Sequence, residues 1–116
     1  MLAPRRRRGF EYLDDPATPA DVRERSLRDV HVANTLLGGT HAVLAELRRI
    51  LPALGERATL LDVGTGAADI PAASARLAER RGVRLTTFAV DEAESLLHAA
   101  STRLDHGICA DARRLP

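Results

Sequence analysis

The spacing of apolar residues in the first part of the chain predicts a helix that starts near residue 18. Thr18 is the expected N-cap, Pro19 takes the first helical position and Asp21 completes a pair like that of a capping box. Gly38 and Gly39 are expected to end this helix. Its apolar face is an imperfect stripe made of Val22, Leu27, Val30, Ala33, Asn34 and Leu37.

A second amphipathic helix is expected directly after the glycine pair, with Thr40 as its N-cap. Pro52 is expected to stop it, because proline cannot continue a helix beyond its first turn. The apolar positions follow one another at i, i+1, i+4, i+7 and i+8, which places them on one face: Val43, Leu44, Leu47, Ile50 and Leu51.

After this second helix, short apolar runs alternate with helical stretches. The run 58–63 closes on a glycine pair and is typical of a strand buried on both faces. Strands are also expected at 83–90 and 107–110, and helices at 69–81 and 92–104. A β-α-β-α-β order favours a parallel, Rossmann-like sheet with right-handed crossovers. The sequence therefore predicts an α/β fold, one half of a doubly wound fold, preceded by two helices.

The length of 116 residues suits one folded unit, since domains commonly have roughly 100 to 200 residues. Within it we expect an irregular arm at 1–17, a helical segment at 18–57 and a partial cofactor-binding domain at 58–116. The run Arg5–Arg8 is expected to be a solvated part of the arm, with binding to an acidic partner or substrate tail as the alternative.

The charges nearly cancel: seventeen basic residues, all of them arginine, stand against sixteen acidic ones, and the net charge is +1. This balance does not favour a polyanion-binding protein. Aromatic residues are also scarce, although single-strand nucleic-acid platforms need rings on which bases stack. The chain has only Phe10, Tyr12 and Phe88. We therefore expect no nucleic-acid partner.

Several features favour a soluble, cytoplasmic protein without a membrane partner. No apolar run approaches the roughly 18 residues of a spanning helix, and the basic start is not followed by the apolar region of a signal peptide. The single cysteine, Cys109, cannot form an internal disulfide. No metal site is expected either, because the four histidines lack the spacing of metal ligands: His31, His41, His98 and His106.

The segment from Asp62 to Pro71 combines the end of a strand, a glycine turn and the start of a helix. Gly64 and Gly66 allow a sharp turn and the close approach of a ligand, whose negative group meets free N–H groups at the helix N-terminus. A dinucleotide fingerprint needs glycine or alanine five residues after Gly64, but this chain has Asp69, which would repel a pyrophosphate. NAD is therefore disfavoured, and S-adenosylmethionine, with its amino-acid carboxylate and sulfonium, suits the turn better.

The part of the chain after residue 57 resembles the class I S-adenosylmethionine-dependent methyltransferases. The first motif of that family is matched by Asp62, Gly64 and Gly66, with Ala68 where a third glycine is common. Its acidic residue after the second strand is matched by Asp91. Its third motif is matched by 110–116, which contain Asp111 and Ala112 and end in Leu-Pro.

The resemblance implies a role for each matched residue. Gly64 and Gly66 would lie under the methionine part of the cofactor. Asp91 would accept hydrogen bonds from both ribose hydroxyls, as a carboxylate can. Asp111, with the backbone of Ala112, would read the adenine ring. The resemblance also implies that the helices before the first strand help to cover a substrate pocket, which draws attention to His41.

Structural interpretations of the same residues remain open. The two glycines can form a tight turn only, Asp69 is expected to act as a helix N-cap, Asp91 can be the N-cap of the next helix and Asp111 can be a turn residue. These roles are compatible with ligand binding, since a capping carboxylate keeps further acceptor sites.

We therefore expect a methyltransferase that acts on a small-molecule methyl acceptor, present as a truncated N-terminal portion, with no catalytic residue identified. The alternatives are a non-catalytic nucleotide-binding or remnant module and, less favoured, an NAD-dependent oxidoreductase. In such a truncated sheet the segment 60–63 is expected to form an unpaired apolar edge, through which the chain can self-associate.

Overall fold

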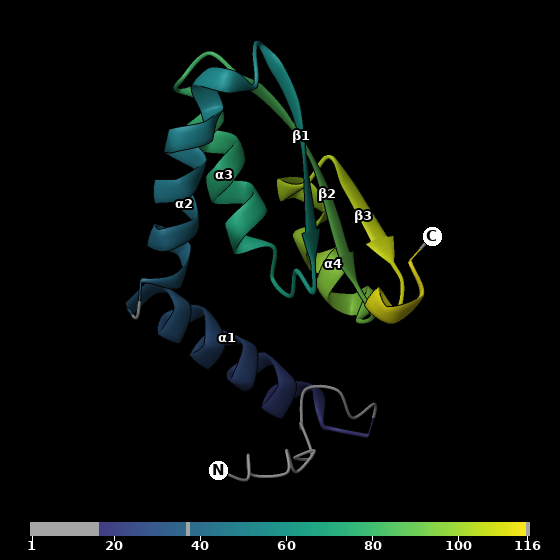
Figure 1. Ribbon diagram of the computed structural model, residues 1–116. Coiled ribbons are helices and arrows are strands. Elements are labelled where there is room, and N and C mark those ends of the chain that lie inside the picture. Colours follow the sequence, from purple (N-terminus) through teal and green to yellow (C-terminus); the bar gives the residue numbers. More distant parts are fainter. Residues whose placement is uncertain (1–16, 37, 116) are drawn as a thin grey trace, which may run out of the picture.

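The computed structural model describes residues 17–36 and 38–115 (Figure 1). The expected arm, with Arg5–Arg8, lies outside the described residues except for Ala17. The described chain is an α/β structure with one parallel three-stranded sheet and four α-helices. The α/β class and the predicted order, two helices followed by β-α-β-α-β, are confirmed.

Two helices precede the sheet, α1 (Ala20–Leu36) and α2 (Gly39–Ile50). The N–H of Arg23 donates to the carbonyl of Pro19, which makes Pro19 the N-cap of α1, so the prediction of Thr18 as the cap is wrong. The prediction of Thr40 as the cap of α2 is also wrong. That helix already begins at Gly39, because Gly38 adopts a left-handed conformation with φ of 78° that glycine reaches without strain.

Figure 1 shows α1 extending away from the sheet at the start of α2. Val22 and Val30, which belong to its predicted apolar stripe, are exposed. The helix α2 ends before Pro52, as predicted, and a single 3-10 turn at Leu51–Ala53 follows. None of the described helices is both long enough and apolar enough to cross a membrane.

The three strands are parallel and lie in the order β1-β2-β3, with Leu61 beside Phe88 and Phe88 beside His106. Their bounds fall within one residue of the predicted ones, whereas the last helix is shorter than predicted and ends in a 3-10 turn at Ser101–Arg103. The elements are β1 (Arg57–Val63), α3 (Asp69–Glu79), β2 (Arg84–Asp91), α4 (Glu94–Ala100) and β3 (His106–Cys109).

The core lies between one face of the sheet and the helices. Right-handed crossovers that step in the same direction place α3 and α4 on the same side of the sheet, and α2 packs against α3. From β1, Ala58 and Leu60 pack against this core. Its buried members come from α2, α3, β2 and the turns between them: Leu47, Leu51, Leu77, Ala78, Val83 and Leu85.

The opposite face of the sheet is apolar and open to solvent. Leu61 is 57% exposed, Val63 45% and Ile108 40%. The prediction that β1 is buried on both faces is therefore wrong, because α2 and α3 pack on one side of it only. Among the described strands β1 pairs with β2 alone, so its outer edge is unpaired.

A polar contact fixes the loop before β3 to the middle of β2. Oδ2 of Asp105 accepts hydrogen bonds from the buried Thr87, at 2.9 Å from its backbone N–H and 3.0 Å from its hydroxyl. These bonds, and to a smaller extent the charge of Arg84, lower the pKa of Asp105. On the next residue, the ring of His106 stacks on Phe88 with centroids 4.4 Å apart. These contacts fix the start of β3 against β2. Because β3 is short, they also fix the position of its carboxyl end, where Asp111 follows.

Candidate functional site

The turn between β1 and α3 has the sharp geometry that its glycines predict. Gly64 has φ of 73° and Gly66 φ of 53°, values in the left-handed region that favours glycine. The N–H groups of Gly64 and Thr65 donate to the carbonyl of Val90, at 2.8 and 3.1 Å. These bonds extend the pairing of β1 with β2 past the end of β1 and bring the turn next to Asp91.

Asp91 joins the glycine turn to the start of α4. Its Oδ2 accepts from the backbone N–H of Gly66 at 2.8 Å, and its Oδ1 accepts from the N–H of Ala93 at 2.9 Å. Ala93, rather than Asp91, holds the N-cap position of α4. Because each carboxylate oxygen has two lone pairs, each keeps one acceptor site for a further donor.

Asp111 lies at the end of β3, where the N–H of Ala110 donates to the carbonyl of Asp91 at 3.0 Å. Its Oδ1 accepts from the backbone N–H of Arg113 and caps the 3-10 turn Ala112–Arg114, so the interpretation as a turn residue is confirmed. The side chain of Arg113 also binds this carboxylate. These bonds lower the pKa of Asp111 to about 2.

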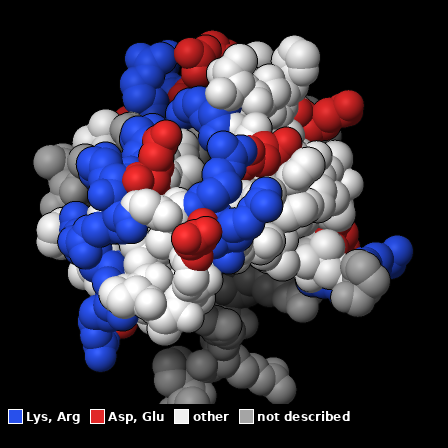
Figure 2. Space-filling view, turned by 90° about the horizontal axis from the view of Figure 1, so that it is seen from above, with Lys and Arg blue, Asp and Glu red and all other residues white. Residues whose placement is uncertain are grey.

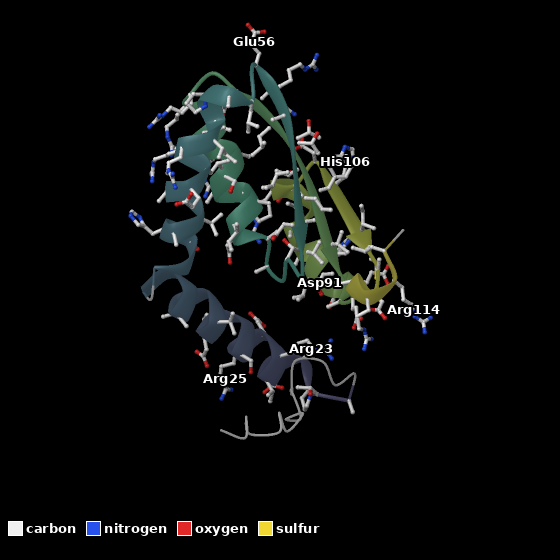
Figure 3. The ribbon with its side chains drawn as sticks, in the orientation of Figure 1. Arg23, Arg25, Glu56, Asp91, His106 and Arg114 are labelled. Carbon is white, nitrogen blue, oxygen red and sulfur yellow. The ribbon has the colours of Figure 1, made fainter. Side chains whose placement is uncertain are left out.

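These residues line a cleft of about 590 Å³ at the carboxyl ends of the strands, the place where ligands bind in open parallel sheets. Figure 3 shows Asp91 and Arg114 at this end, opposite Glu56. Of the predicted residues, the cleft brings together Gly64, Asp91, Asp111 and Ala112. The other residues that line it are Val90, Glu92, Ala110 and Arg113.

The other two predicted residues, Gly66 and Asp62, do not line the cleft. Gly66 reaches it through its hydrogen bond to Asp91. Asp62 does not line it: its Oδ2 accepts from the hydroxyl of Thr65 at 2.7 Å, which stiffens the turn from within. Asp62 is therefore a support of the turn in this structure.

The start of α3 departs from the prediction. Ala68 holds the N-cap position in the left-handed conformation, with φ of 58°, and is the one non-glycine residue with positive φ among those described. Asp69 is the first residue of the helix, so its predicted role as N-cap is wrong. Its carboxylate pairs instead with Arg103 at 3.2 Å, and Arg103 also donates to the carbonyl of Ala67 at 2.8 Å.

A larger cavity, of about 620 Å³, lies between α3 and the loop before β3 and contains none of the predicted residues. Two of its three arginines are already paired, Arg84 with Asp105 and Arg103 with Asp69. A smaller cavity of about 360 Å³ beside α2 and α3 is lined by His41, which the structure thus places away from the cleft. Of these three cavities, the cleft at the strand ends is the one that brings carboxylates from two neighbouring strand ends together with the glycine turn after β1.

The charged surface at the other end of the sheet is mixed. Figure 2 shows arginine and acidic side chains next to one another on this end. The last turn of α2 carries Arg48 and Arg49, where cations interact favourably with the negative end of the helix dipole. Arg49 also pairs with Glu46 at 2.9 Å. At least one of these arginines is therefore paired locally. No three potential metal ligands lie together within the described residues.

Three residues of the site are absent from the sequence-based prediction. The hydroxyl of Thr65 donates a hydrogen bond to Asp62, Glu92 lines the cleft beside Asp91, and the side chain of Arg113 donates to Asp111. Glu92 follows a predicted ligand residue directly, which is a usable signal. Arg113 lies within the third motif as a spacer, and nothing in its spacing indicates that its side chain turns back toward the cleft.

The cleft thus combines carboxylate acceptors on two neighbouring strand ends with an N–H donor. The backbone N–H of Ala112 has no hydrogen-bond partner among the described residues. Such a set can accept from hydroxyl and amino groups and donate to a ring nitrogen. Comparisons with protein-family models, with curated proteins and with solved structures find no match to this chain.

Proposed function

We propose that this chain binds S-adenosylmethionine in the cleft at its strand ends, as the cofactor-binding portion of a methyltransferase that acts on a small molecule. One observation carries the proposal. Three segments far apart in the sequence, which separately resemble the cofactor motifs of class I methyltransferases, line or support one cleft: the turn at 64–66, Asp91 and the pair Asp111–Ala112.

The donor and acceptor set fits the nucleoside part of this cofactor. The free lone pairs of Asp91 suit two ribose hydroxyls, because a carboxylate can accept both in parallel. The carboxylate of Asp111 suits the adenine amino group, and the N–H of Ala112 suits a ring nitrogen. The open space around the Cα of Gly64 leaves room for the backbone to approach a ligand closely.

The local charge also suits the cofactor. Three carboxylates line the cleft, Asp91, Glu92 and Asp111, against the single guanidinium of Arg113. A net negative site attracts a sulfonium cation and disfavours a pyrophosphate. When bound, the cofactor supplies an electrophilic methyl group, and the contribution of the protein is to hold it in a fixed orientation toward the acceptor.

Calorimetric titration with S-adenosylmethionine, with adenosine and with NAD tests the proposal. We expect S-adenosylmethionine and adenosine to bind at the same site, which competition between them will reveal, and NAD to bind at least tenfold more weakly, on the order of 1.4 kcal/mol. Binding of NAD in preference to S-adenosylmethionine would point to an oxidoreductase. If neither binds, the cleft is not a nucleoside site and the proposal is wrong.

A further inference from the structure

The side chain of Arg113 lines the cleft and contacts two carboxylates on neighbouring strand ends. Its Nε donates to Oδ1 of Asp111 at 2.9 Å, and its Nη2 donates to Oδ2 at 3.0 Å. The same Nη2 lies 3.6 Å from Oε1 of Glu92, on the neighbouring strand end. One guanidinium is therefore shared between two carboxylates that line the same cleft.

We propose that Arg113 is a latch on the adenine part of the cleft, which a bound nucleoside must displace from Asp111 toward Glu92. The inference rests on the function proposed above and adds a residue that governs affinity. It follows from the acceptor sites of Asp111. A carboxylate offers about four lone-pair positions. The backbone N–H, the Nε and the Nη2 of Arg113 take three of them.

The neighbouring arginine crowds the remaining position. Nε of Arg114 lies 3.9 Å from Oδ2 of Asp111, too far for a hydrogen bond but close enough to hinder a donor that approaches this oxygen. An adenine amino group that uses Asp111 therefore has to replace one of the side-chain bonds of Arg113. The backbone bond that caps the turn can remain.

The exposures of the two partners decide which of them moves. The side chain of Asp111 is 26% exposed and is held at the end of β3, whereas that of Arg113 is 82% exposed. The guanidinium can therefore leave into water, and Glu92 offers it a second partner on the way. Because exposed ion pairs contribute little free energy, displacing the guanidinium costs little. The latch therefore lowers the affinity for a nucleoside without preventing its binding.

Titration with adenosine measures the latch, because this ligand is neutral and salt acts only on the charges of the protein. We expect Arg113→Ala to bind adenosine about 1.5- to 5-fold more tightly than the wild type, the range that exposed ion pairs span. Arg48→Ala is the matched control: it removes the same charge from the last turn of α2, outside the residues that line the cleft, and its affinity should equal that of the wild type.

Salt and Glu92 provide two independent readouts. At about 1 M NaCl, where the Debye length is about 3 Å, the wild type should approach the affinity of Arg113→Ala, which itself should not change. Glu92→Gln should weaken adenosine binding in the wild type, because the displaced guanidinium loses its second partner. The same substitution should have no effect in the Arg113→Ala background.

The outcomes separate the latch from the proposed function. If the wild type binds adenosine and Arg113→Ala binds no more tightly than Arg48→Ala, the cofactor site stands and the latch is wrong. Weaker binding by Arg113→Ala would also show that the latch is wrong, and would indicate instead that Arg113 positions Asp111 for binding. If no variant binds adenosine or S-adenosylmethionine at any salt concentration, the proposed function fails and the latch fails with it.

Discussion

The backbone N–H of Gly66 donates a 2.8 Å hydrogen bond to Oδ2 of Asp91, which lies 25 residues further along the chain. This bond holds the glycine turn against the end of β2. The other oxygen of the same carboxylate accepts from the N–H of Ala93 and sets the start of α4. Asp91, the residue proposed to bind the ribose, therefore also holds together the glycine turn and the start of α4.

Replacing Asp91 should weaken both binding and folding. We expect Asp91→Ala to lose about 1.5 to 3 kcal/mol of S-adenosylmethionine binding, because a charged acceptor of two hydroxyl groups is removed. The free energy of unfolding should fall as well, since the N–H groups of Gly66 and Ala93 lose their partner. Calorimetric titration and urea unfolding measure the two effects separately.

Two further variants keep this prediction testable. Asp91→Asn retains one carbonyl acceptor and should fold better than Asp91→Ala while still binding weakly. Glu94→Ala removes an exposed carboxylate from the first turn of α4 and should leave affinity unchanged. A folded Asp91 variant with the affinity of the wild type would contradict the ribose role.

Replacing Ala68 by glycine should stabilise the turn. The left-handed conformation costs an L-residue about 1 to 2 kcal/mol, and Ala68 adopts it with φ of 58°. The variant loses a buried methyl group worth about 0.8 kcal/mol, so we expect a net gain of up to about 1 kcal/mol in unfolding free energy.

Binding of S-adenosylmethionine by Ala68→Gly should equal or exceed that of the wild type, because the backbone of the turn is unchanged. Ala67→Gly is the control, since Ala67 has no positive φ, and it should give no gain in stability. Clearly weaker binding by Ala68→Gly would show that the comparison of this turn with the methyltransferase motif is wrong.

The stability of the fold should depend on Asp105 at acid pH. Its pKa is lower in the folded chain than the usual 3.8, so its contribution is present above about pH 4 and is lost as the pH falls through the lower folded value. We expect Asp105→Asn to lose about 1 kcal/mol at pH 7, the size of one net hydrogen bond.

Urea unfolding at pH 7 and at pH 3 measures this dependence. The difference between the wild type and Asp105→Asn should shrink at pH 3, because this pH lies below the usual pKa of 3.8 and protonation of the carboxylate then favours the unfolded chain. Asp111 also has a lowered pKa, but it is present in both proteins and its effect cancels in the comparison. A difference that stays constant between the two pH values would refute the role of the carboxylate charge.

The open face and the unpaired edge of β1 should make the chain self-associate. Parallel sheets are normally covered on both faces, and an unpaired apolar edge is a template for pairing with another chain. Light scattering should show a mass that rises with concentration, and Leu61→Arg should suppress the rise because Leu61 is the most exposed apolar residue of β1.

Leu54→Arg provides the comparison for this variant. Leu54 is an exposed apolar side chain outside the sheet, so its replacement should leave association unchanged. A wild-type chain that stays monomeric at every concentration would contradict the prediction. Equal suppression by both variants would show that association does not run through β1.

The site was partly predictable because its residues follow strand ends. Gly64, Asp91 and Asp111 each come just after an apolar run, and the carboxyl ends of parallel strands meet at one edge of a sheet. Thr65 and Arg113 were not predictable, because their roles depend on where a side chain turns and which oxygen it meets. The same holds for Asp69, whose partner Arg103 lies 34 residues away.

The amino-acid sequence by itself determined the order of helices and strands and the position of the sharp turn, because hydrophobic period and glycine conformation act over a few neighbouring residues. Only the tertiary structure decided which face of β1 is covered, since that depends on the side to which both crossover helices return. It also decided that Asp91 binds Gly66 and that Arg113 spans Asp111 and Glu92. These contacts join separate strand ends, and burial and hydrogen bonding across such distances arise only once the chain has folded.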